Sequence, residues 1–137
     1  MSTRSEILIT ETWVDKKGKR HNETIKLYHH HDGYPEGVGK FLMDEVYPTL
    51  QSSNNYSNCD VVNFLIKHKE DDEFELTTSR HVDIEYQYHI NVSAKTIKCF
   101  AGHYNYEYNS DKTPRFVKRK ECDLKQFLPQ NLKALYK

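Results

Sequence analysis

The stretch VDIEYQYHINV, residues 82–92, decides the fold. Apolar or aromatic side chains occupy every second position, and polar side chains fill the positions between them. Because successive side chains of a β-strand point to opposite faces of the sheet, this period of two predicts a strand with one buried and one solvent-facing side. Tyr86 and Tyr88 fall on the buried side, whereas Asp83 and Glu85 fall on the solvent-facing side.

Further strands are predicted around this stretch. Residues 74–79 predict a shorter strand before it. After a turn at residues 91–95, residues 96–108 predict a long strand with a bulge or bend near Gly102. Residues 115–120 are either a last strand or an extended arm.

The N-terminal part of the chain predicts a β-hairpin. Residues 6–14 and 23–31 are rich in β-branched and aromatic side chains. The connection between them, residues 15–20, contains Gly18 and five charged residues, as expected for a solvated turn.

Two helices are predicted between the hairpin and the alternating stretch. Residues 38–50 carry apolar side chains at helical spacing, and Pro48 is expected to end this helix because proline lacks an N–H. Residues 59–69 predict a second amphipathic helix, with Ser57 or Asn58 as its N-cap.

This order of elements predicts an α+β fold. Strands joined by short turns cannot be parallel neighbours, since a parallel crossover needs about a dozen residues. We therefore expect an antiparallel sheet of about five to six strands with two helices packed on one face. The length of 137 residues fits a single α+β domain over residues 1–137, with a flexible C-terminal tail from about residue 110.

Composition excludes several classes of protein. Twenty Lys and Arg residues balance twenty Asp and Glu residues, so the domain has no overall basic field of the kind that dominates non-specific DNA binding. No apolar run approaches the ~18 residues of a membrane span. The three widely spaced cysteines predict neither a disulfide framework nor a thiolate zinc site, but reduced thiols in the cytoplasm; they are Cys59, Cys99 and Cys122. No nucleophile-elbow, phosphate-loop or dinucleotide motif is present, and no cofactor is predicted.

Histidine and carboxylate side chains form one candidate site. His29 and His31 would share one face of a strand that runs into Asp32, and Asp83 and Glu85 would share a face of the later strand. Such groups can ligate a divalent metal, which makes a metal-dependent hydrolase one alternative function. A strand end in a tight turn and a solvent-facing strand explain the same residues without chemistry.

A glycine-rich segment before the first helix forms a second candidate site. Gly33, Gly37 and Gly39 precede a helix N-terminus that could hold an anion, so a nucleotide-binding sponge is another alternative. The segment lacks the Gly-Lys-Ser/Thr ending of a phosphate-binding loop.

Aromatic and basic residues form the third and favoured candidate site. Exposed tyrosines suit a macromolecular interface, and basic residues steer a partner and fix its register. The candidate binding residues are Tyr34, Tyr104, Tyr106, Tyr108, Lys16, Lys17, Arg119 and Lys120. An exposed edge strand would also allow a homodimer.

The segments HDGYPEGVGKFL and DIEYQYHI resemble a pattern in small uncharacterised proteins of phages and prophages. The resemblance implies a small cytosolic accessory protein, a group in which inhibitors of host defence, including anti-CRISPR-type proteins, form a natural class. Taken with the absence of catalytic motifs, it leads us to expect a non-enzymatic binding protein that occludes a protein or nucleoprotein partner.

Overall fold

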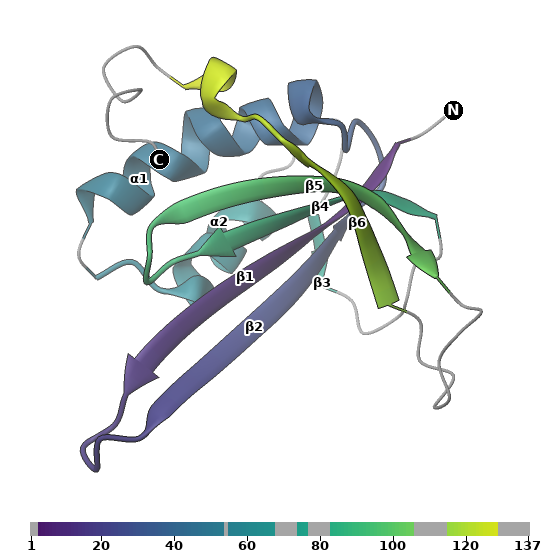
Figure 1. Ribbon diagram of the computed structural model, residues 1–137. Helices are drawn as coiled ribbons and strands as arrows, with labels where there is room; N and C mark the ends of the chain where they lie inside the picture. The colour runs from purple at the N-terminus through teal and green to yellow at the C-terminus, as the bar shows by residue number, and fades with distance from the viewer. Residues whose placement is uncertain (1–2, 54, 68–73, 77–82, 106–114, 129–137) are drawn as a thin grey trace.

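A computed structural model describes residues 3–53, 55–67, 74–76, 83–105 and 115–128. These residues form a six-stranded sheet with helices on one side, so the α+β prediction is confirmed (Figure 1). The spatial order of the strands is β3-β2-β1-β4-β5-β6. Their bounds are β1 Arg4–Val14, β2 Arg20–His29, β3 Phe74–Leu76, β4 Ile84–Asn91, β5 Thr96–Asn105 and β6 Arg115–Cys122.

One pair of strands at the centre of the sheet is parallel. β1 and β4 run in the same direction, with Ile7 beside Tyr88 and Ile9 beside Ile90, whereas the other neighbours are antiparallel. The sheet is therefore mixed rather than wholly antiparallel. The rule about short turns does not apply to this pair, because β2, the helices and β3 all lie between β1 and β4 in the chain, which is ample length for a crossover.

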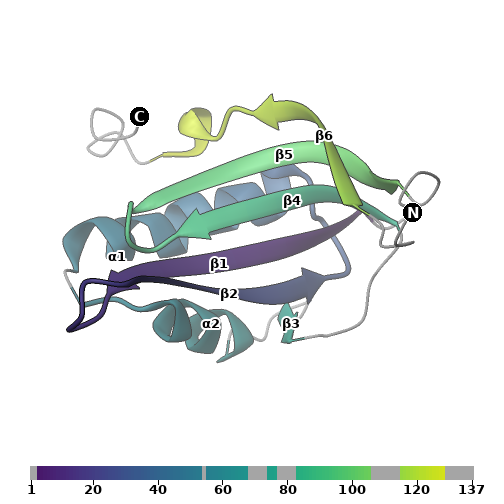
Figure 2. The ribbon, with the colours of Figure 1, turned by 60° about the horizontal axis from the view of Figure 1, so that its bottom comes forward.

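The helical segments cover one face of the sheet (Figure 2). They are η1 (Pro35–Gly39) and η2 (Leu42–Val46), both wound as π-helix, followed by α1 (Tyr47–Ser52) and α2 (Asn58–Lys67). The prediction that Pro48 ends the first helix is wrong. Tyr47 N–H already bonds five residues back to Leu42, and Pro48 lies in the first turn of α1, where a missing N–H costs little.

The alternation of residues 82–92 builds the core as predicted, within the part that the structure describes. Ile84, Tyr88, Ile90 and Val92 are buried, and Tyr86 packs against the core from the side. The Tyr88 hydroxyl donates to the carbonyl of Gly33 at 2.7 Å, so the buried phenol is satisfied. Burial raises its pKa above the ordinary tyrosine value.

The structure also confirms two local predictions, a helix cap at Ser57 and a bulge near Gly102. Ser57 caps α2: its Oγ accepts the N–H of Asp60 at 3.2 Å, while Asp60 Oδ2 accepts the N–H of Ser57 at 2.8 Å. The β5–β6 pairing shifts register between Ala101 and Gly102. A Cβ at Gly102 would lie 2.1 Å from the carbonyl oxygen of Val117, so only glycine fits this bulge.

The described part of the predicted C-terminal tail is structured. Residues 115–122 form β6, and residues 125–127 form the short 3-10 helix η3. Leu124 and Leu128 are buried in the core beside it. Residues 106–114 and 129–137 lie outside the described residues.

Candidate binding surface

The β1–β2 hairpin extends past the rest of the sheet (Figures 1 and 2). Hydrogen bonds tie it to the body just before its tip, where Thr12 bonds to Ser93 in the β4–β5 turn, and Glu11 and Glu23 bond to Asn58. Asn58, at the start of α2, donates its N–H to Glu11 Oε1 at 2.8 Å and its side-chain amide to Glu23 Oε1 at 3.0 Å. Glu11 and Glu23 are opposed across the strands, and the N-terminus of α2 offsets their mutual repulsion. Residues 13–21, the hairpin tip, lie beyond these anchors.

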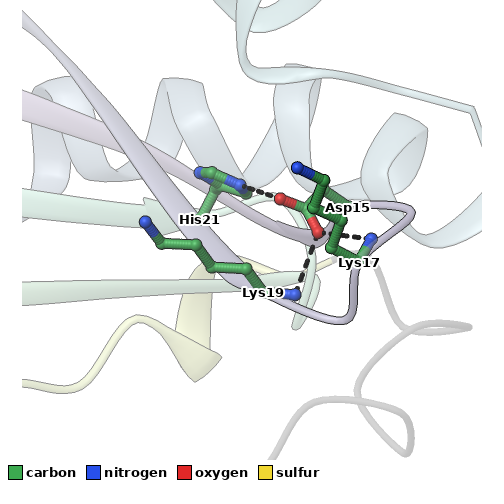
Figure 3. Close-up of polar contacts among 4 residues, drawn as sticks. All are labelled: Asp15, Lys17, Lys19 and His21. Atoms are coloured by element: carbon green, nitrogen blue, oxygen red, sulfur yellow. Dashed lines mark hydrogen bonds and ion pairs between the residues drawn. The ribbon is translucent and has the colours of Figure 1, made fainter.

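Asp15 gives the hairpin tip a fixed shape (Figure 3). Its Oδ1 accepts the N–H groups of Lys17 and Lys19 at 2.8 and 2.9 Å, and its Oδ2 lies 2.7 Å from His21 Nε2. Gly18, with φ of 82°, closes the turn. The hydrogen bond from His21, followed by the backbone N–H of Lys19, lowers the pKa of the Asp15 carboxyl, so this acid stays ionised in its turn.

The hairpin tip combines an exposed aromatic platform with positive charge. Trp13 is 43% exposed and stacks on its cross-strand neighbour His21, with ring centroids 5.4 Å apart and planes inclined by 18°. Val14 beside it is 60% exposed. Four exposed basic residues accompany one carboxylate, whose hydrogen bonds are all used within the turn: Lys16, Lys17, Lys19 and Arg20.

A second basic surface lies on β6, at the far side of the sheet from the hairpin tip (Figures 1 and 2). Arg119 and Lys120 are exposed there, and the Lys118 ammonium lies 4.1 Å from the centroid of the Phe100 ring. The structure therefore separates the two predicted basic segments instead of joining them. β6 is an edge of the described sheet, and its lysines together with the bulge at Gly102 oppose strand pairing between copies.

The predicted tyrosines occupy different parts of the molecule. Tyr34 is exposed at the start of η1, where its hydroxyl donates to Asp32 Oδ1 at 3.0 Å. Tyr104 is half-buried on β5 and bonds to the carboxylate of Glu6. Tyr106 and Tyr108 lie outside the described residues. Of the three tyrosines predicted to form a binding surface on the late strand, the structure describes only Tyr104, and its hydroxyl is already bonded within the protein.

Sequence reasoning missed a buried polar network on the sheet face opposite the helices. Glu6 is 2% exposed and accepts a hydrogen bond from Gln87 Nε2 at 2.6 Å, and Lys26 Nζ lies 3.8 Å from its other oxygen. Gln87 in turn accepts from His89 Nε2 at 2.7 Å. The alternation placed Gln87 and His89 on a solvent-facing side, but Gln87 is 6% exposed and His89 is half-buried.

The electrostatics of His89 follow from this burial. Desolvation, together with the nearby positive charges of Lys118 and Lys98, lowers the pKa of His89 to about 4. Because the neutral ring donates through Nε2 to Gln87, the network is complete without a charged imidazole. Its members satisfy one another, which favours a structural role for the network.

The predicted metal ligands are not brought together. His29 is buried with its ring 4.4 Å from that of Phe74, whereas His31 is exposed and its ring meets His30. Asp83 pairs with Arg4 at 2.6 Å, and Glu85 is exposed. Among the residues that the structure describes, no three His, Cys, Asp or Glu side chains are grouped to hold a metal ion.

The glycine-rich segment is used for close packing of the chain. A Cβ at Gly37 would lie 2.2 Å from the carbonyl oxygen of Asp32, and one at Gly33 would lie 2.7 Å from Ser5 Cβ. The N–H groups of Gly37 and Val38 donate to the carbonyls of Tyr34 and Asp32, both at 2.9 Å. The donors that the nucleotide-site prediction needed are therefore occupied within the turn.

Comparison with family models, curated proteins and solved structures gives no match. Within the described ranges, no helix combines the length and apolar character that a membrane crossing requires.

Proposed function

We propose that this protein is a non-enzymatic binding protein, and that it acts as a phage-type inhibitor of a host defence complex, anti-CRISPR-like in mode, by occluding a working surface. The observation that carries the proposal is the hairpin tip: an exposed tryptophan, stacked and framed by four basic residues, held out from the body on a rigid turn. The partner class is a protein or nucleoprotein with an acidic or phosphate-bearing surface.

Three properties of the hairpin tip support this function. Tryptophan is among the residues that contribute most to interface energies, and Trp13 is exposed on the hairpin tip. Asp15 fixes the shape of the hairpin tip before binding, so association loses little conformational entropy. The surrounding lysines and Arg20 would raise the association rate with a negative partner.

The β6 surface adds to this proposal as a steering field rather than as an anchor. Arg119 and Lys120 are long, exposed side chains at an edge, where single charges contribute little affinity but alter the association rate and its salt dependence. Tyr34, which is exposed at the opposite end of β2 from the hairpin tip, is a candidate for a peripheral contact.

The test is a binding measurement with matched variants. The tagged protein is used to isolate a complex from host lysate, and that complex is purified and titrated with wild-type and variant protein. Trp13→Ala should weaken binding by about 2 kcal/mol, roughly 30-fold, as for a central anchor. Leu76→Ala serves as its control, because Leu76 is 65% exposed on β3, away from the hairpin tip.

Charge is tested in the same way. Lys16→Glu with Lys17→Glu should slow association and reduce its salt dependence, while Lys67→Glu with Lys125→Glu makes an equal change of charge on exposed positions elsewhere.

Occlusion requires that inhibition of the partner be complete at a stoichiometric ratio. Inactivation by a small fraction of an equivalent would indicate turnover and contradict the non-enzymatic proposal, as would tip variants that bind as tightly as the controls.

A further inference from the structure

Two cysteines face each other across the last two strands. Cys99 on β5 is the direct cross-strand partner of Cys122 on β6. Opposed residues of antiparallel strands have Cα atoms about 4.5–5.5 Å apart. A disulfide needs a Cα separation of about 4.4–6.8 Å, so the backbone already holds this pair at bridging distance.

The two thiols have different access to solvent. Cys99 is fully buried in the core, where its thiol lies close to the Cys122 thiol and the Tyr88 hydroxyl. Cys122 is half-buried and lines a surface pocket formed by residues 96–98 and 121–124. Cys122 is part of the pocket lining and Cys99 is not, so a small molecule that enters this pocket reaches Cys122 first.

We propose that Cys99 and Cys122 form a redox-active pair that closes to a cross-strand disulfide when a peroxide oxidises the protein. Cys122 Sγ attacks one oxygen of hydrogen peroxide, the O–O bond breaks, and a sulfenic acid and one water result. The Cys99 sulfur then attacks Cys122 Sγ, gives up its proton, and displaces the sulfenic oxygen as a second water. In sum, two thiols lose two electrons and two protons, and one peroxide becomes two waters.

The order of the two steps follows from burial. Burial of Cys99 raises its pKa well above that of an ordinary thiol, so it is a poor first nucleophile. It is well placed as the resolving thiol, because it lies directly across the strands from the cysteine that would be oxidised. The bridge would join β6, an edge strand of the described sheet, covalently to β5, and so fix the strand that carries Lys118, Arg119 and Lys120.

Cys59 provides an internal comparison. It is exposed on α2 and lies on a different element from the pair. If oxidation simply followed exposure, Cys59 would react most readily and link two chains to each other. If the cross-strand pairing determines which thiols react, Cys59 keeps its thiol while Cys99 and Cys122 lose theirs.

The experiment treats the native full-length chain with a small molar excess of hydrogen peroxide, blocks the remaining thiols, and digests with trypsin without reductant. Cleavage after lysine and arginine places Cys99 in residues 99–112, Cys122 in residues 121–125 and Cys59 in residues 41–67. We expect a linked product of the first two peptides, a fall from three titratable thiols to one, and full reversal by dithiothreitol.

Variants separate the proposed pair from general oxidation. Cys59→Ser should leave the linkage unchanged, and Cys122→Ser should abolish it while the buried Cys99 stays reduced. With Cys99→Ser, a sulfenic acid at Cys122 should persist and be trapped by dimedone. Because Cys99 is in the core and this variant can fail to fold, the first two variants decide the question by themselves. A Cys59–Cys122 bridge, or overoxidised Cys122 beside reduced Cys99 in the wild type, would overturn the proposal.

Discussion

The two tight hairpins of the sheet differ in how their turns are held. The β4–β5 turn, residues 92–95, is tied to the body from two sides: Ser93 Oγ accepts from Thr12 N–H and donates to its carbonyl, both at 2.9 Å, and Gln51 Nε2 donates to the carbonyl of Lys95 at 2.7 Å. The β1–β2 hairpin tip is shaped by Asp15, a residue of its own turn, and its aromatic residue points outward.

This difference separates a structural turn from a recognition turn. The apex residues of the β4–β5 turn, Ser93 and Ala94, are exposed but small, so this turn adds stability and offers a partner little side-chain surface. A turn that is organised from within keeps its surface free without becoming disordered. The proposed interface therefore lies on the β1–β2 hairpin, although both hairpins use the same antiparallel geometry.

Substitution of valine in each turn gives the largest expected contrast in stability. Val92→Ala removes buried methyl groups from the core and should lower the free energy of unfolding by about 2 kcal/mol. Val14→Ala alters an exposed side chain and should change it by about 0.5 kcal/mol or less. Urea denaturation of both variants measures this difference. Equal losses would mean that the hairpin tip packs against the body after all.

Much of the fold was predictable because its signals are local. The alternation around Tyr88, the cap at Ser57 and the bulge at Gly102 each depend on a few neighbouring residues, and each is found where it was expected. The parallel β1–β4 pair was not predictable in the same way. It depends on which distant strand lies beside β1, and no local pattern encodes that choice.

The candidate site was predictable in part. Charge and a turn glycine predict that Lys16 and Lys17 are exposed. The strand predicted over residues 6–14 does not single out Trp13, because the exposure of Trp13 depends on how far the hairpin extends past the rest of the sheet. The network around Glu6 and Gln87 was missed for the opposite reason. A polar residue in an alternating strand is predicted to face solvent. Whether it is buried instead depends on the curvature of the sheet and on the side chains that neighbouring strands place beside it.

The pH dependence of stability sharpens the comparison further, because the β4–β5 hairpin contains the half-buried His89. Its pKa in the folded protein is about 4, against about 6.5 in the unfolded chain. Above pH 6.5 both states are neutral. As the pH falls toward 4, His89 becomes protonated in the unfolded chain but stays neutral in the folded protein. The free energy of unfolding therefore decreases with decreasing pH.

This loss should amount to about 1–2 kcal/mol between pH 7 and pH 4, after allowance for the partial exposure of the ring. Unfolding in urea at several pH values measures it, and His89→Gln should remove that share of the pH dependence. In the wild type, the ring signals of His89 in NMR spectra should keep their neutral positions down to about pH 5. A midpoint near 6.5 for His89 would contradict the buried network that the structure shows.

The smallest expected effect concerns Asp15, which organises the hairpin tip. Its pKa is lowered in the folded protein, mainly by the hydrogen bond from His21, so its contribution to stability is present above the unfolded value near 3.8 and is lost as the pH falls through the folded one. Asp15→Asn should therefore lower stability slightly at neutral pH and flatten the pH dependence of stability in the acidic range. The same change should speed amide hydrogen exchange at Lys17 and Lys19, whose N–H groups the carboxylate accepts, and leave exchange at Ala94 in the other turn unchanged. His21→Gln removes the largest cause of the shift but keeps those two bonds, so it should alter the acidic dependence and spare the exchange rates. If both variants sped exchange equally, the bond between His21 and Asp15, rather than the bonds of Asp15 to the backbone, would be what holds the tip in shape.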